Sequence, residues 1–260
     1  MKNLFRTYPN LSRLVTGALL LAAALIGSGF IHMPFVPAGL LLVILVNWLM
    51  FRSENKNLGL LGLDLQPKHL LLLLFGLLLG MASFLLSLYA GTLLRGGSIV
   101  QNTSMDFPQL LKSFIAIFPT TAVQDFIIIG YCFYKMIQLT NKSIATLVFG
   151  LFFISLHDVW GGNLVNTLFY ASGLFMGYLM FSTSLLRSGT IWLPIGLHWG
   201  NNFANTYLFT FSRTTTSWLY VSGPQHPLTT IPQAIGLFIA LNIGVAAVTG
   251  LICLLWRRRL

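Results

Sequence analysis

The sequence predicts an all-α polytopic membrane protein, with about eight transmembrane helices bundled around a polar cavity inside the membrane. Composition is the first reason, because 56% of the 260 residues are hydrophobic, only 8% are charged and the mean hydropathy is +0.81. Soluble globular domains carry about 25% charged residues. The second reason is that long apolar runs follow one another along the whole chain. The third is that a few polar residues interrupt these runs, which is typical of side chains that face the interior of a bundle.

Eight apolar segments are candidates for membrane helices, since a helix needs about 20 residues to cross the hydrocarbon core. They lie near residues 14–32, 37–51, 69–91, 115–136, 143–158, 164–186, 189–209 and 232–256. The first is interpreted as an uncleaved span, because the rest of the chain is equally apolar. Residues 106–114 are expected to form an amphipathic helix, with a bend at Pro119 just after it. No linker interrupts the runs, so residues 1–260 are interpreted as one integral membrane domain.

The basic residues predict the orientation of the chain. With both termini inside, the cytoplasmic side would hold Lys2, Arg6, Arg13, Arg52, Lys56, Lys68, Lys135, Lys142, Arg187, Arg257, Arg258 and Arg259. The outer side would hold Arg95 and Arg213, and the side of Lys112 is ambiguous. This is the distribution of a membrane protein with cytoplasmic termini. The net charge of +10 is therefore attributed to membrane topology, and nucleic-acid binding is not expected.

Pairs of glycines four residues apart occur in three of the predicted helices. They are Gly76 and Gly80, Gly173 and Gly177, and Gly196 and Gly200. Such pairs let helix backbones approach closely, so tight packing is expected at all three. The last pair flanks His198, where a close approach could also shape a site.

The apolar run that begins at Phe114 contains one charged residue before Lys135, which is Asp125, preceded by Gln124. Ten residues of helix separate Asp125 from Lys135, or roughly 15 Å, which places the carboxylate near the middle of the membrane. A carboxylate there needs a partner, water or a function.

Two further clusters lie between the middle of the membrane and its outer leaflet. Phe153 and His157 are four residues apart and share one helix face, and His157 lies roughly 22 Å along the helix from Lys142, nearer the outer side. The last cluster is a polar stripe at helical spacing, formed by His198, Asn201, Asn202 and Asn205. His198 lies roughly 16 Å along the helix from Arg187, which matches the depth of Asp125. Each polar residue alone is explained by an interhelical hydrogen bond, but three clusters in one zone, from the midplane into the outer leaflet, favour a site.

The chemistry that such residues support is hydrolysis. A carboxylate such as Asp125 can take a proton from water as a general base. His198 and Asn202 can stabilise the oxyanion of a tetrahedral intermediate, and His157 can orient the water. No cofactor is expected, although Asp125, His157 and His198 are also of the types that bind a divalent metal such as zinc.

The motifs resemble those of the CAAX protease and bacteriocin-processing family of intramembrane endopeptidases, also called the abortive-infection family. That family carries EExxxR, FxxxH and HxxxN or HxxxD in this order. Phe153 to His157 matches the second motif and His198 to Asn202 matches the third, and the resemblance covers about residues 110–205. The first motif differs, because "QDFIIIG" places Gln124 and Asp125 at the glutamates and Ile129 at the arginine.

The resemblance implies an intramembrane endopeptidase that cleaves a membrane-associated or lipidated, CAAX-like protein or peptide by water attack. It also implies an integral protein of a bacterial cell membrane, with Asp125, His157, His198 and Asn202 as catalytic residues and Phe153 and Asn201 in support. In the family the first glutamate is the favoured base, and Gln124 cannot act as one.

The degraded first motif leaves a second interpretation open. The chain could be a catalytically impaired pseudoprotease that acts as a bacteriocin-immunity protein or binds a membrane partner. A proton-relaying transporter is a third alternative. It is disfavoured because the two halves of the chain do not share a motif spacing.

Overall fold

The computed structural model describes residues 7–31, 37–64, 66–159, 164–223, 226 and 230–256, and most of them are helical. The α-helices are α2 (Pro9–Ser28), α3 (Ala38–Arg52), α4 (Pro67–Leu94), α5 (Phe107–Ile128), α6 (Tyr131–Leu139), α7 (Lys142–Ser155), α8 (Leu164–Ser188), α9 (Trp192–Phe203) and α10 (Ile231–Leu255). A short 3₁₀-helix, η1 (Leu58–Leu61), precedes α4, and a π-helical turn, η2 (Ala204–Leu208), extends α9.

Side-chain caps fix where several of these helices begin. Asp106 accepts a hydrogen bond from the backbone N–H of Gln109 at the start of α5, and Asn141 accepts one from Ile144 at the start of α7. Thr230 forms a capping box with Gln233 at the start of α10. These bonds satisfy N–H groups that have no partner inside the helix, which is why polar residues stand at these boundaries of an apolar chain.

Within the described residues, five helices are long and apolar enough to cross a membrane. They are Pro9–Ser28, Pro67–Leu94, Phe107–Leu139, Thr167–Ser188 and Ile231–Leu255. Each predicted segment contains a helix, but those at 37–51, 143–158 and 189–209 form α3, α7 and α9, which have 15, 14 and 12 residues. The expected number of about eight full spans is therefore not confirmed, because three of the apolar runs form helices too short to cross alone.

The outer surfaces of the long helices are apolar. Leu19 of α2 and Leu71 and Leu78 of α4 each expose more than 60% of their surface, and similar side chains follow on the other spans. Exposed apolar area of this extent is unfavourable in water and suits lipid. The chain is an integral membrane protein on this evidence, whereas the side on which its termini lie stays a prediction.

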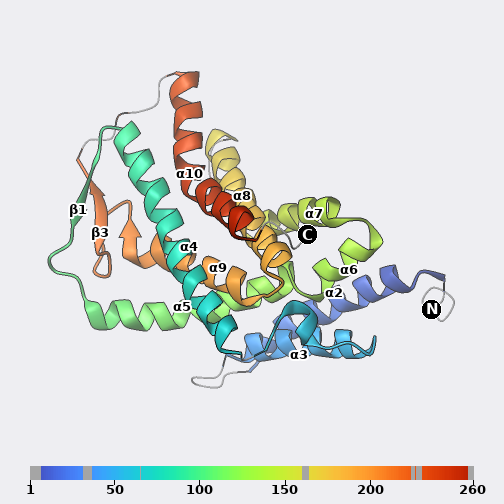
Figure 1. Cartoon of the computed structure of the whole chain (residues 1–260). Coiled ribbons are helices and arrows are strands. Elements are labelled where there is room, and N and C mark those ends of the chain that lie inside the picture. Colours follow the sequence, from blue (N-terminus) through green and yellow to red (C-terminus); the bar gives the residue numbers. More distant parts are fainter. Residues whose placement is uncertain are drawn as a thin grey trace.

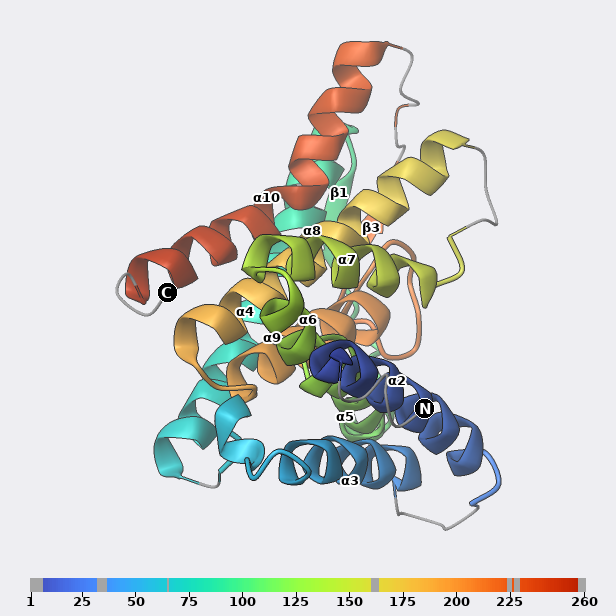
Figure 2. The same cartoon turned by 90° about the vertical axis from the view of Figure 1, so that its right-hand side faces the viewer.

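The helices form two groups that meet around α9. Figures 1 and 2 show α2 and α3 together at one end of the molecule, while α8 and α10 extend toward the opposite end. Helix α4 packs against both α9 and α10, and α8 packs against α7, α9 and α10. A large cluster of buried side chains connects α3, α5, α6, α7, α8 and α9 into one core.

A small sheet corrects the all-α prediction. Strands β1 (Ser98–Gln101) and β3 (Leu219–Ser222) pair antiparallel, and β2 (Phe209–Thr210) pairs parallel to β3. Figure 1 shows the sheet beside α4. Its strands are too short to produce a clear alternating pattern in the sequence, and β1 lies more than 100 residues before β2 and β3, so local patterning could not reveal the sheet.

Glycines bring α4 and α9 into direct backbone contact. A Cβ atom on Gly80 would lie 2.1 Å from the carbonyl oxygen of Leu197, and one on Gly200 would lie 2.0 Å from that of Leu77. Gly76 and Gly196 are equally confined, so the expected tight packing is confirmed for these two pairs. For the pair in α8 it is wrong, because no atom lies within 4 Å of a Cβ built on Gly173.

The fourth predicted span is a broken helix. Helix α5 continues through Pro119 and ends at Ile128, and α6 begins at Tyr131, so residues 106–114 belong to α5 rather than to a separate helix. Asn47 of α3 stabilises the break. Its fully buried side chain donates to the carbonyl oxygen of Phe126 (3.3 Å) and accepts from the backbone N–H of Tyr131 (2.7 Å). An α3 side chain therefore satisfies backbone groups that the interruption leaves open.

Candidate active site

A cavity of about 770 Å³ lies among α4, α5, α7, α8, α9 and α10. Its walls are mainly apolar and aromatic, with residues such as Phe84, Phe169 and Leu241. Polar side chains also line it, among them Gln124 of α5, His198 of α9 and His157, two residues after the end of α7. The size and the mixture of apolar and polar groups are typical of a ligand site.

His198 is the most enclosed polar residue of this wall. Its side chain is 2% exposed, and its Nδ1 lies 3.0 Å from Oδ1 of Asp125. The ring of Phe181 stacks on the imidazole, with centroids 4.4 Å apart and planes 24° apart. The edge of Phe153 approaches it at 5.8 Å. Packing and the carboxylate together therefore hold the imidazole in one orientation.

Asp125 is connected to the cavity only through its hydrogen bond to His198 among the described residues. The carboxyl group is fully buried, does not line the cavity and has His198 as the one side chain in hydrogen-bonding contact among the described residues. Its Oδ2 atom has no hydrogen-bond partner in the described part of the chain. Gln124, one residue earlier and about 100° around the helix, lines the cavity instead. The residue that contacts the cavity from this turn of α5 is thus an amide and not a carboxylate.

His157 lies just after the end of α7 and lines the cavity beside Phe153. Its Nδ1 lies 2.8 Å from the carbonyl oxygen of Phe153. The two rings are in edge contact, with centroids 4.6 Å apart. Phe153 therefore contacts both His157 and His198. The four-residue spacing of the second motif puts His157 about one helical turn after Phe153, so the backbone carbonyl of Phe153 can hold the imidazole of His157.

The polar stripe of α9 faces the cavity. His198, Asn201, Asn202 and Asn205 all line it, the last of them from the π-helical turn that extends α9. The Nδ2 of Asn202 donates to Oγ1 of Thr121 at 3.5 Å, a long bond that links α9 to α5. The opposite face of α9 carries the glycines that touch α4. Helix α9 therefore packs on α4 with one face and lines the cavity with the other.

Ile129, which the motif alignment predicts at the position of the arginine, does not line the cavity. It is fully buried, and its backbone N–H donates to the carbonyl oxygen of Asp125 where α5 ends. An apolar side chain at this position supplies no positive charge to Asp125.

The three residues considered as metal ligands do not form a metal site. In the described part of the chain, no group of three His, Cys, Asp or Glu side chains is placed so that it could hold a metal ion. Asp125 contacts His198 but stays outside the cavity that His157 lines, which does not fit a common coordination point for the three.

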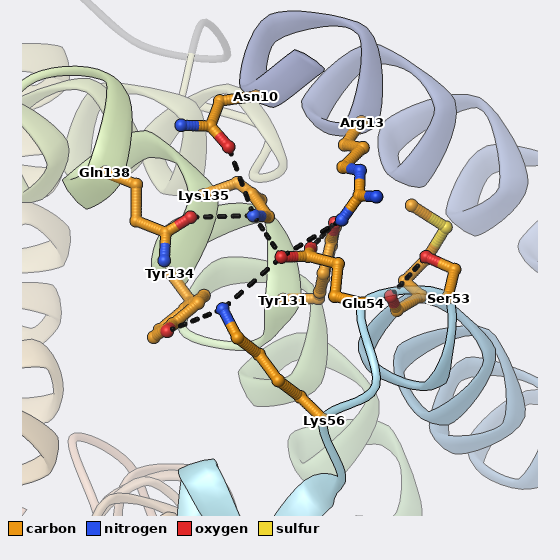
Figure 3. Close-up of polar contacts among 10 residues, drawn as sticks. Asn10, Arg13, Ser53, Glu54, Lys56, Tyr131, Tyr134, Lys135 and Gln138 are labelled. Atoms are coloured by element: carbon orange, nitrogen blue, oxygen red, sulfur yellow. Dashed lines mark hydrogen bonds and ion pairs between the residues drawn. The ribbon is translucent and has the colours of Figure 1, made fainter. Parts of the chain in front are cut away.

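A second polar cluster, centred on Glu54, was not predicted from the sequence. Figure 3 shows the carboxylate among basic side chains from three parts of the chain. Its Oε2 lies 2.6 Å from Nζ of Lys135, 3.1 Å from Nη1 of Arg13 and 3.3 Å from Nζ of Lys56. The hydroxyl of Tyr131 donates to Oε1. The cluster joins α2, α6 and the segment after α3. The feature of the sequence that could have indicated it is a single acidic residue, Glu54, between Arg52 and Lys56.

The environment of Glu54 favours its charged form. Burial disfavours ionisation, but hydrogen bonds from Lys135 and Tyr131, with the charges of Lys135 and Arg13, outweigh it and lower the pKa of Glu54 to about 2. The carboxylate therefore stays ionised at neutral pH and neutralises part of the charge of Arg13, Lys56 and Lys135.

The fold and the site define a polytopic membrane protein with a cavity lined by two histidines and several asparagines. Residues 106–204 match the model of the Rce1-like family, described as type II CAAX prenyl endopeptidase Rce1-like. The segment that carries Asp125, His157, His198 and Asn202 is thus similar to that family, and the match confirms the resemblance seen in the motifs. A search of curated proteins finds no match to the chain.

Proposed function

We propose that the chain is a CAAX-type intramembrane endopeptidase, which hydrolyses a peptide bond in a membrane-associated or lipidated peptide or protein. The observation that carries the proposal is that His157, His198 and Asn202 line the same cavity. These are the histidines and the asparagine of the family's second and third motifs. A water held there would meet acceptors and donors of the kind that acyl transfer to water requires.

The apolar part of the cavity supports a hydrophobic or lipidated substrate. Apolar side chains such as Phe169, Leu174 and Leu237 line the same cavity as the histidines. They provide a surface on which an apolar chain of a substrate gains free energy by burial. A substrate that binds in this way would present its peptide to His157 and His198.

The test compares peptide termini in membranes. Wild type, His198→Ala and the control His69→Ala, which alters a histidine outside this cavity, are expressed in a strain that lacks the chromosomal copy. New termini of membrane proteins and secreted peptides are then quantified by mass spectrometry. Termini that appear with wild type and His69→Ala but not with His198→Ala are expected. Identical termini in all three strains would contradict the proposal.

One observation favours a second candidate, a pseudoprotease that binds a hydrophobic peptide or a membrane partner, as in bacteriocin immunity. Among the described residues, those that line the cavity include no carboxylate, and Gln124 stands where the family's base is expected. This candidate predicts unchanged termini together with protection or partner binding that survives His198→Ala. The two functions therefore give opposite results with the same variants.

A further inference from the structure

We propose that His198, polarised by Asp125, is the general base of this site, and that the amide of Gln124 donates a hydrogen bond to the developing oxyanion. The inference rests on the proposed hydrolase function. It assigns to a histidine–aspartate pair the proton transfer that a glutamate is expected to perform in the family, and it turns the replaced residue into a stabilising donor.

The hydrogen bond between His198 and Asp125 joins Nδ1 of the imidazole to Oδ1 of the carboxyl group at 3.0 Å. When Asp125 is ionised, its carboxylate only accepts, so Nδ1 of His198 then carries the proton. The unprotonated Nε2 then holds a lone pair. No described residue hydrogen-bonds to Nε2, and His198 lines the cavity, so this lone pair is available to a water molecule. A buried carboxylate on Nδ1 also stabilises the imidazolium that forms when Nε2 takes a proton.

The environment of His157 suits a different role. A backbone carbonyl only accepts, so Nδ1 of His157, 2.8 Å from the oxygen of Phe153, is also protonated and its Nε2 is an acceptor. No carboxylate contacts His157 in the described structure, so a positive charge on it would be less stabilised than one on His198. His157 is therefore placed to accept a hydrogen bond from the water and orient it.

Gln124 supplies a donor where a glutamate would supply an acceptor. Its amide lines the same cavity as His198 and Asn202, and the amide groups of Gln124 and Asn202 come from different helices, α5 and α9. Two N–H donors from rigid helices are suited to stabilise negative charge on a substrate oxygen. A glutamate at position 124 would oppose that charge.

The reaction then runs in two balanced steps. The water oxygen attacks the carbonyl carbon of the scissile bond while Nε2 of His198 takes one water proton, and the C=O π electrons move onto the oxygen. In the second step the oxyanion reforms the C=O bond, the C–N bond breaks, and the imidazolium returns its proton to the leaving nitrogen. The products are a carboxylic acid and an amine, and His198 is neutral again.

The first arm of the test is kinetic and uses a fluorescence-quenched peptide with a lipidated cysteine as the probe. Asp125→Asn is expected to lower kcat by about 10³–10⁴-fold with little change in KM, because an amide at this position favours the wrong tautomer. Gln124→Glu is expected to lower kcat further rather than restore it. Asp158→Asn, which removes an exposed carboxylate, serves as the control and is expected to keep wild-type kcat.

The second arm needs no turnover. Nitrogen-15 NMR of histidine-labelled protein in micelles is expected to show His198 protonated at Nδ1 in wild type, and this state is expected to be lost in Asp125→Asn. An increase of kcat in Gln124→Glu, an unchanged kcat in Asp125→Asn, or a wild-type His198 protonated at Nε2 alone would overturn the inference. If wild type cleaves nothing, the hydrolase proposal fails. The NMR measurement then still tests whether Asp125 holds His198 protonated at Nδ1.

Discussion

Nζ of Lys135 lies 2.6 Å from Oε2 of Glu54, and the side chains of the two residues are only 1% and 7% exposed. The carboxylate also contacts Arg13 and Lys56, so one anion serves three cations. Removal of Glu54 would therefore leave the buried ammonium group of Lys135 without a counter-charge. The stability of the contact between α2, α3 and α6 should depend on this single carboxylate.

We expect Glu54→Gln to lower the free energy of unfolding by about 3–5 kcal/mol, the usual cost of leaving a buried charge unpaired. Lys56→Met should cost only about 0–1 kcal/mol, because Lys56 is one-third exposed and surface ion pairs contribute little. Thermal unfolding of both variants in the same detergent, followed by tryptophan fluorescence, measures the difference. Equal shifts would mean that the cluster is not held by its carboxylate.

The same carboxylate predicts how stability varies with pH. The pKa of Glu54 is about 2 in the folded protein and 4.5 as its ordinary value, so between these values the unfolded chain binds more protons. Its stabilising contribution is therefore complete above about pH 4.5 and is lost as the pH falls toward 2. The gap in unfolding midpoint between wild type and Glu54→Gln should be largest at pH 7 and should narrow below pH 4. A gap that stays constant across this range would contradict the assignment.

The contact between α4 and α9 predicts a strong effect of a small substitution. Gly80→Ala would place a methyl group 2.1 Å from the carbonyl oxygen of Leu197, so the helices must separate. We expect a loss of about 1–3 kcal/mol, as for an overpacked core. Gly250→Ala is the matched control, since no atom lies within 4 Å of its Cβ. Unfolding midpoints in micelles test the pair, and a Gly80→Ala protein as stable as Gly250→Ala would exclude the close contact.

The buried amide of Asn47 predicts a further loss of stability. Asn47→Leu keeps a similar volume but removes the partners of the Phe126 carbonyl and the Tyr131 N–H, at about 1–3 kcal/mol for each unsatisfied group. Asn242→Leu removes a single bond to the carbonyl of Phe238 within α10 and should cost less. Chemical denaturation of both proteins compares them. Exchange of the Tyr131 amide hydrogen should also quicken in Asn47→Leu, and unchanged exchange would argue against a bond at this break.

The helices could be predicted from the sequence because each apolar run is a local signal. The glycine spacing predicted the close contact of α4 and α9, because it marks a face on which backbones can meet. The same spacing in α8 lies beside the cavity instead, so the spacing alone does not identify a contact. The lengths of the helices were less predictable. Apolar residues continue past the ends of α7 and α9, and the boundaries there depend on the His157 segment and on the π-helical turn after Phe203.

The direction of Asp125 could not be predicted from periodicity. Gln124 and Asp125 are neighbours on a helix that is apolar on all sides, so the sequence does not indicate which of the two faces a cavity. The contact between Asp125 and His198, whose ring stacks on Phe181, decides it. The Glu54 cluster and the strand pairing depend on contacts between distant segments, for which a single sequence contains no direct signal.

Gly173 and Gly177 line the cavity from α8, and at neither position would a Cβ atom clash with the rest of the protein. The groups that we propose to react stand on α5, on α9 and beside α7, so the residues that set the width of the cavity and those proposed for its chemistry lie on different helices. Larger residues at these two positions would narrow the cavity without displacing His157 or His198. Substitution of these two glycines could thus change which ligands the cavity accepts, while His157 and His198 stay the same.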